Sequence, residues 1–251
     1  MNKDKFLIIF GLTADPIHLG HEQAIINGID YCRSNGIYIE QFLLMPVYQP
    51  NLIGNKNAPV VSYEHRFSMC EMVAERLSIQ LDCVIKVSHI EKELAERTGE
   101  KNYSFNTIRA LNIDASSINE WIPAFAGMTE EETGMTEKET GLMDQVAGMT
   151  NLLFMVSADH FGGRWPKFRK WYKWREILRY SGLLINQRSG NRINDSFIRE
   201  LRQINSEVFV VQNSDVIDVS SSRIRRQLGA NQAVELLAPD VLNYIKEHSL
   251  Y

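Results

Sequence analysis

The chain has 251 residues and a hydrophobic fraction of 44%, which suits one α/β domain with a sizeable core or two small domains. No stretch approaches the roughly 20 apolar residues of a membrane span, so a membrane-spanning protein is not expected. The three cysteines have no C-x-x-C spacing, which excludes a complete disulfide framework and indicates a reducing, cytoplasmic location.

Strand-like and helix-like segments alternate along the sequence. Apolar runs predict strands, and helical periodicity between them predicts helices. The strands are expected at residues 5–11, 41–47, 83–90, 152–156, 182–186 and 208–212. The helices are expected at residues 19–34, 62–77, 104–112, 170–179 and 195–204. This alternation predicts the α/β fold class, with a parallel sheet and with ligands bound beyond the carboxyl ends of its strands.

The first predicted strand opens into residues 11–21, GLTADPIHLGH. His18 and His21 are three residues apart at the start of a predicted helix, so both imidazoles share a face and can meet one ligand. Gly20 between them lets a backbone or a phosphate come close, and the amides at a helix start favour an anion. A His-x-x-His pair alone is common, so the placement directly after a buried strand is what indicates a phosphate site.

Acidic residues gather in one segment of the chain. Residues 115–150 hold seven acidic side chains and one lysine, and the triplet Gly-Met-Thr occurs there three times. Low complexity with high charge predicts a solvated insertion rather than part of the core. The whole chain carries a net charge of −4 and this segment alone −6, so the acidity belongs to this segment and the rest of the chain is slightly basic. We therefore expect a single domain over residues 1–251, interrupted by an insertion at about residues 116–150.

Basic and aromatic residues interleave between Arg164 and Arg179. Such a face can stack on single-stranded RNA and neutralise its phosphates. Trp174 and Ile177 stand at helical spacing, however, which is typical of a core face with a solvated basic side. The core interpretation is preferred, and no nucleic-acid partner is expected.

Three serines precede a basic, helix-like run at residues 217–228, IDVSSSRIRRQL. A serine at this place can cap a helix. The serine hydroxyls, the helix amides and Arg225 can also form a phosphate site together. On the residues alone, the capped helix with a basic outer face is the preferred interpretation.

The string at residues 11–21 resembles G-x-F-D-P-x-H-x-G-H, the H-x-G-H signature of the nucleotidyltransferase superfamily, although Leu12 and Ala14 depart from it. Further strings resemble motifs of the bacterial nicotinate-nucleotide adenylyltransferases, in the same order along the chain. They are SYEHRFSM, NYSFNTIRAL, SADHF with WYKW, VSSSRIR and APDVLNYIKEHSLY. One departure concerns the substrate phosphates, because Leu52 and Ile53 occupy the positions of a family His-Lys pair, and Lys56 is the candidate replacement cation.

This resemblance implies a Rossmann-like nucleotidyltransferase fold, with helices on both faces of the parallel sheet. It implies adenylyl transfer from ATP to nicotinate mononucleotide, which gives nicotinate adenine dinucleotide and pyrophosphate in NAD biosynthesis. The two substrates are the expected partners, and homo-oligomerisation is left open. Mg²⁺ would enter with ATP and bind mainly through its phosphates.

The resemblance also implies roles for individual residues, and it reserves no side chain for a metal. The expected catalytic residues are His18, His21 and Arg225. The expected ATP-binding residues are Gly11, Thr13, Asp15, Gly20, Asp159, Ser220, Ser221 and Ser222. The expected nicotinate mononucleotide-binding residues are Tyr103, Thr107, Trp171 and Lys56.

Three other functions stay open at this point. One is a sibling adenylyltransferase that accepts nicotinamide mononucleotide or phosphopantetheine. Another is an RNA-binding module that uses the face between Arg164 and Arg179. The third is a nucleotide-binding protein that has lost catalysis, which the departures at Leu12, Ala14 and Leu52 suggest.

Overall fold

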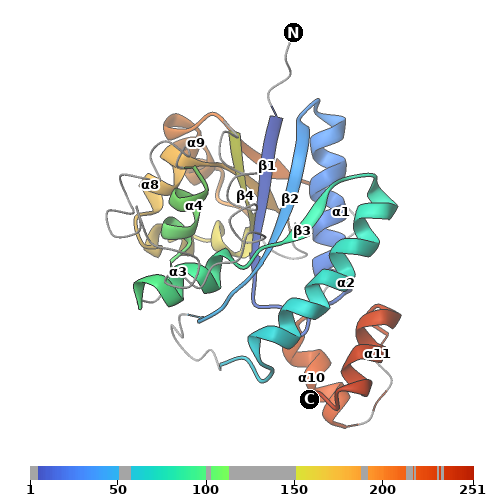
Figure 1. Ribbon diagram of the computed structural model, residues 1–251. Coiled ribbons are helices and arrows are strands. Elements are labelled where there is room, and N and C mark those ends of the chain that lie inside the picture. Colours follow the sequence, from blue (N-terminus) through green and yellow to red (C-terminus); the bar gives the residue numbers. More distant parts are fainter. Residues whose placement is uncertain are drawn as a thin grey trace, which may run out of the picture.

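A parallel six-stranded sheet forms the centre of the molecule (Figure 1), with the strand order β3-β2-β1-β4-β5-β6. The computed structural model describes residues 5–50, 58–99, 103–112, 151–187, 192–212, 217, 219–230, 232 and 235–251. The strands are β1 (Lys5–Leu12), β2 (Tyr38–Pro46), β3 (Ile85–Val87), β4 (Asn151–Ser157), β5 (Gly182–Asn186) and β6 (Val208–Val211). The predicted α/β fold class with a parallel sheet is therefore confirmed.

Helices cover both faces of the sheet (Figure 1). On one face lie α1 (Leu19–Ser34) and α2 (Tyr63–Leu81). The helices α10 (Ser221–Gly229) and α11 (Pro239–Glu247) lie near the carboxyl end of the sheet (Figure 1), and their buried residues join the same core. On the other face lie α3 (Ile90–Thr98), α4 (Ser104–Asn112), α8 (Trp174–Tyr180) and α9 (Asp195–Ile204). The alternation in β1 explains this arrangement, because Ile8 packs into the first core and Ile9 into the second, and both are fully buried. A strand that is buried on both faces needs a continuous apolar run, and β1 has one.

The strand order places β1 beside β4 in the middle of the sheet, with Phe6 paired to Asn151 and Phe10 to Met155. From β1 the chain proceeds to β2 on one side, and from β4 it proceeds to β5 on the other side. A crevice opens beyond the carboxyl ends of strands where the winding direction reverses in this way. The two central strands therefore mark the place for a ligand.

Several predicted elements were wrong in their extent. The strand expected at residues 41–47 is β2, which begins three residues earlier, at Tyr38, and the helix expected at residues 62–77 is α2, which continues four residues further, to Leu81. The strand expected at residues 83–90 is only β3, because the Ser88 hydroxyl accepts the amide of Ile90 and α3 starts there. The helix expected at residues 170–179 is interrupted, because Lys173 has a positive φ of 51° and α8 begins only at Trp174. A short 3₁₀ turn, Lys167–Lys170, precedes it. The burial expected for Trp174 and Ile177 is confirmed.

Helices α3 and α11 were not among the predicted elements. Each buries apolar residues four positions apart, Ile90 with Leu94 in α3 and Val241 with Ile245 in α11. Two such residues make too short a pattern to stand out in the sequence. The insertion at about residues 116–150 lies outside the described residues, so the domain organisation stays a prediction. Within the described ranges, no helix is long and apolar enough to cross a bilayer.

Candidate active site

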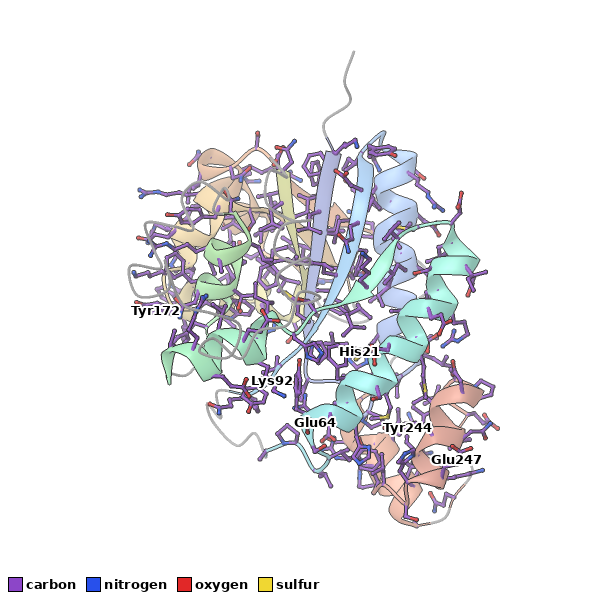
Figure 2. The ribbon with its side chains drawn as sticks, viewed as in Figure 1. His21, Glu64, Lys92, Tyr172, Tyr244 and Glu247 are labelled. Atoms are coloured by element: carbon purple, nitrogen blue, oxygen red, sulfur yellow. The ribbon has the colours of Figure 1, made fainter. Side chains whose placement is uncertain are left out.

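A cleft of about 370 Å³ lies beyond the carboxyl ends of β1, β4 and β5. Its walls come from the ends of these three strands, the first two turns of α1 and the segment that leads into α10. Figure 2 shows His21 at this end of the sheet. The cleft brings together most of the site residues expected from the sequence. Those that line it are Gly11, Thr13, His18, Gly20, His21, Asp159, Trp171, Ser220 and Ser221.

The two histidines lie against each other on the wall of the cleft. Their rings are stacked, with centroids 3.8 Å apart and an angle of 30° between the planes. His18 is the N-cap of α1 in an extended conformation and is only 5% exposed, while His21 occupies the first turn. The predicted common face is therefore confirmed, since both imidazoles reach one side of the helix start.

One hydrogen bond indicates the tautomer of His21. The backbone amide of His18 donates to Nδ1 of His21 at 3.3 Å. A ring nitrogen that accepts a hydrogen bond carries no proton, so a neutral His21 holds its proton on Nε2. The ring can then donate from Nε2 to an anionic oxygen in the cleft.

The amides at the start of α1 are less available to an anion than the sequence suggests. The amide of Leu19 donates to the carbonyl of Leu236 at 3.0 Å, and the amide of His21 donates to the carbonyl of His18 at 2.7 Å. Gly20 lines the cleft and also allows a close approach within the protein. A Cβ there would lie 2.7 Å from Cγ1 of Val219 and 3.1 Å from the His18 ring. Glycine is therefore needed for close packing of the protein with itself.

The three serines at the N-terminus of α10 have three different partners. The Ser220 hydroxyl caps α10 by accepting the amide of Arg223 at 3.3 Å, which confirms the predicted cap. The Ser221 hydroxyl donates to the carbonyl of Pro16 at 3.2 Å, so it ties α10 to the loop before α1. Ser222 accepts a hydrogen bond from Arg225 at 3.2 Å and does not line the cleft.

Asp15 is sealed beneath the cleft wall instead of facing the cleft. It is 2% exposed, and its two carboxylate oxygens accept the amides of Val60 at 2.9 Å and Val61 at 3.3 Å. Arg225 donates to the Asp15 carbonyl at 2.6 Å and lies 3.3 Å from its carboxylate. A buried carboxylate needs such charge-assisted partners. Asp15 thus holds Arg225 at the edge of the site, and neither side chain lines the cleft.

Arg66 braces the same region from α2. Its guanidinium is buried and donates to the carbonyls of Thr13 and Val47, each at 2.8 Å. Burial lowers the pKa of Arg66, and the negative charge of Asp15 opposes that change. Sequence reasoning gave Arg66 no role, because its partners are backbone atoms of segments that are distant along the chain.

The residues expected on the nicotinate side are only partly brought together. Trp171 lines the cleft, and the His160 ring meets it edge-on with centroids 5.1 Å apart. Thr107 is buried elsewhere and donates to Glu91 at 2.7 Å. Tyr103 lies against Tyr172, with ring centroids 4.9 Å apart, and is not part of the lining. Lys56 lies outside the described residues.

Several polar residues of the cleft were missed. The Gln23 amide donates to Asn27 at 2.8 Å, and the Asn186 amide donates to the carbonyl of Ala24 at 2.8 Å. Asn186 ends the apolar strand β5, so its position at the end of a predicted strand was a usable signal. Asp159 is the one carboxylate among the described lining residues. In the described part of the chain, no three His, Cys, Asp or Glu residues gather into a metal site.

The basic face between Arg164 and Arg179 is largely engaged by the protein. Arg169 lies 4.5 Å from the Phe197 ring centroid and forms an ion pair with Glu200. Arg175 lies 4.2 Å from the Trp174 ring centroid. These contacts support the core interpretation of this segment.

Known proteins resemble the chain over its full length. A family model described as cytidylyltransferase-like matches residues 9–227. A probable nicotinate-nucleotide adenylyltransferase of Solibacter usitatus is 29% identical over 98% of each chain, and one of Hydrogenovibrio crunogenus is 23% identical over 100% of each. The solved Plasmodium falciparum nicotinic acid mononucleotide adenylyltransferase, complexed with NaAD, shares the fold at a TM-score of 0.61. It is 16% identical and is matched over 98% of this chain and 97% of its own. The chain belongs to the cytidylyltransferase-like family.

Proposed function

We propose that the protein is a nicotinate-nucleotide adenylyltransferase, which transfers the adenylyl group of ATP to nicotinate mononucleotide and releases pyrophosphate. The observation that carries this proposal is the stacked pair of His18 and His21 on the wall of a cleft at the centre of the sheet. The full-length relatives named as such enzymes support it. A site for a small nucleotide is expected at this edge of a doubly wound sheet.

The chemistry needs no protein nucleophile. The phosphate of the mononucleotide is already anionic near neutral pH, and it attacks the α-phosphorus of ATP while the bond to pyrophosphate breaks. The protein has to align the two phosphates and stabilise the charge that moves onto the leaving group. His18 and His21 can donate to phosphate oxygens from the cleft wall, with Nε2 of His21 as a donor.

The start of α10 would hold the outer phosphates. Ser220 and Ser221 line the cleft there, and a helix N-terminus favours an anion. Arg225 lies directly behind them on Asp15, and we propose that it turns toward the β- and γ-phosphates when ATP binds. Mg²⁺ bound to the phosphates would neutralise part of their charge. Asp159 is the described lining carboxylate that could meet its water shell.

The mononucleotide would bind toward β4, where Trp171 and His160 form an aromatic wall. The flat nicotinate ring can stack on the indole. Tyr103 and Thr107, expected here from the resemblance, do not face the cleft, so Trp171 is the predicted ring contact that the geometry supports.

A panel of acceptors tests the proposal. Purified protein is given ATP and Mg²⁺ with nicotinate mononucleotide, nicotinamide mononucleotide or phosphopantetheine, and pyrophosphate release is measured. We expect the highest kcat/KM with nicotinate mononucleotide. A higher value with another acceptor would identify a sibling enzyme, and ATP binding without release in any mixture would identify a protein that has lost catalysis.

A further inference from the structure

The segment after α11 returns to the loop between β1 and α1. There the Tyr251 hydroxyl donates to Oδ1 of Asp15 at 2.9 Å. Tyr251 also packs against the core on this face of the sheet. Burial and the neighbouring Asp15 charge both raise the pKa of Tyr251, so its hydroxyl stays protonated and remains a donor around neutral pH.

Asp15 links Tyr251 to the candidate active site. The same carboxylate lies 3.3 Å from Arg225, and the Asp15 carbonyl accepts a hydrogen bond from that guanidinium. His18, the cap of α1, follows three residues later. A shift of the Asp15 carboxylate would therefore move both a proposed phosphate-binding cation and the start of the helix that carries the two histidines.

Other parts of the C-terminal region hold the same loop by backbone contacts. The carbonyl of Leu236 accepts the amide of Leu19, and Ser221 donates to Pro16. These contacts fix the course of the backbone. The Tyr251 contact differs because it ends on a buried charge, and hydrogen bonds to charged groups are about twice as strong as neutral ones.

We propose that Tyr251 is a positioning residue for adenylyl transfer. Its hydroxyl fixes the Asp15 carboxylate, and through it Arg225 and the loop before His18, in the arrangement that receives the triphosphate. This inference rests on the proposed function. It assigns the effect to ATP and not to the mononucleotide, because Asp15 contacts Arg225, whereas Trp171, the proposed contact of the nicotinate ring, comes from the segment between β4 and α8.

The test compares two tyrosine hydroxyls in the same C-terminal region. Tyr251→Phe removes the donor to Asp15 and keeps the ring. Tyr244→Phe is the matched control, because its hydroxyl pairs with His65 at 2.9 Å, away from Asp15. We expect Tyr251→Phe to lower kcat/KM for ATP about tenfold, the size of one hydrogen bond to a charged group. The KM for the mononucleotide should stay within about twofold, since its wall is unchanged.

Three further measurements separate positioning from simple destabilisation. Urea unfolding should show the larger loss of stability for Tyr251→Phe, because its hydroxyl bonds a buried carboxylate. Both variants should nevertheless stay folded under the assay conditions, and only Tyr251→Phe should alter the ATP parameters. In a double-mutant cycle, Asp15→Asn should remove most of the effect of Tyr251→Phe, because the two residues act as a unit. Unchanged ATP parameters, or equal losses for both substrates, would overturn the inference. The affinity for a non-hydrolysable ATP analogue can be measured without any acceptor, and Tyr251→Phe should weaken it. Failure of this inference can therefore be distinguished from failure of the proposed function.

Discussion

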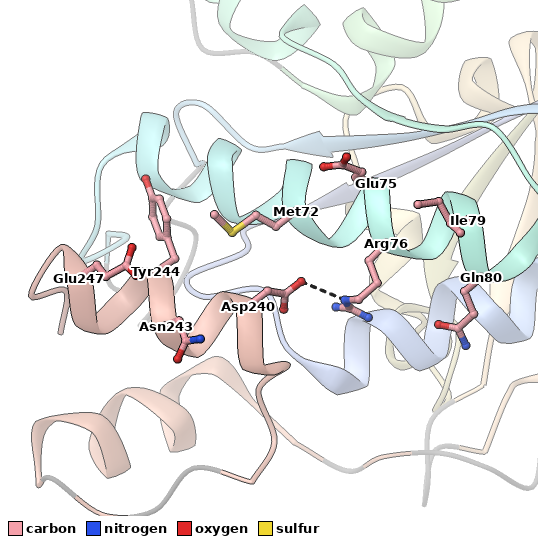
Figure 3. A pocket seen from close by; sticks show the side chains of 9 residues that line it. All are labelled: Met72, Glu75, Arg76, Ile79, Gln80, Asp240, Asn243, Tyr244 and Glu247. Carbon is pink, nitrogen blue, oxygen red and sulfur yellow. Dashed lines mark hydrogen bonds and ion pairs between the residues drawn. The ribbon is translucent and has the colours of Figure 1, made fainter.

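Two hollows in the described part of the chain differ in the residues that line them. The groove between α2 and α11 holds about 620 Å³, against about 370 Å³ for the cleft at the strand ends. Figure 3 shows that the groove is lined by side chains of two helices, with Arg76 paired to Asp240 across it. The cleft is instead lined by residues at the carboxyl ends of three strands and at the N-termini of two helices. Size alone therefore does not mark the active site, whereas convergence of polar groups at the carboxyl ends of strands does.

Arg76 and Asp240 of the groove form ion pairs within the protein. Arg76 donates to both carboxylate oxygens of Glu22 at 2.9 and 3.0 Å, and to Asp240 at 3.0 Å. These carboxylates raise the pKa of Arg76. Glu22 belongs to α1, so this cluster ties α1, α2 and α11 together. Substitutions in this cluster of the groove should therefore lower the free energy of unfolding, and substitutions in the cleft should lower kcat or raise KM.

Replacement of His18 should give the largest effect. His18→Ala removes a donor to the phosphates, and loss of one such donor typically costs about 10²–10³ in kcat. Since His18 occupies the N-cap position of α1, His18→Asn is the matched control, because asparagine is favoured at that position but offers no imidazole. Both variants should lose turnover, and the asparagine variant should keep the urea midpoint. Full turnover by either would remove His18 from the mechanism.

Replacement of Arg76 should affect stability without a matching loss of turnover. Arg76→Leu removes the bidentate partner of the Glu22 carboxylate. The Glu22 side chain is only 6% exposed, so the carboxylate would stay buried without an ion-pair partner. We expect a loss of about 2 kcal/mol in the free energy of unfolding, below the value for a fully buried pair because Arg76 is partly exposed. Asp240→Asn removes only the outer ion pair and should cost less than about 1 kcal/mol. Equal losses of unfolding free energy in the two variants would show that the Glu22 contact contributes no more than the Asp240 contact.

Trp171→Ala should weaken binding of the mononucleotide. An aromatic stacking contact contributes about 0.5–1.5 kcal/mol, so the KM for nicotinate mononucleotide should rise about fivefold while that for ATP stays near its original value. Trp165→Ala is the control, since this neighbouring indole is 76% exposed and does not line the cleft. An identical response of the two variants would place the nicotinate ring elsewhere.

The sequence predicted the residues that line the cleft better than the buried contacts that support them. His18 and His21 could be placed because they are three residues apart on one helix start, and Asp159 because it follows an apolar strand. Asp15 was assigned to ATP on its motif alone. Its actual partners, Arg225 and Tyr251, stand 210 and 236 residues away along the chain. No local pattern reveals such a contact, and the same limit applies to Thr107, whose partner Glu91 lies on another helix.

The smallest effect is expected on the groove surface itself. Ile79 lines the groove and is 80% exposed, so Ile79→Ser removes apolar surface that already contacts water. Surface substitutions away from caps, cores and ion pairs usually change stability by less than about 0.5 kcal/mol. We expect unchanged kcat and KM values for both substrates and an unchanged urea midpoint. A change in kcat or KM in this variant would show that the groove influences the cleft, and would contradict the view that the groove contributes to stability alone.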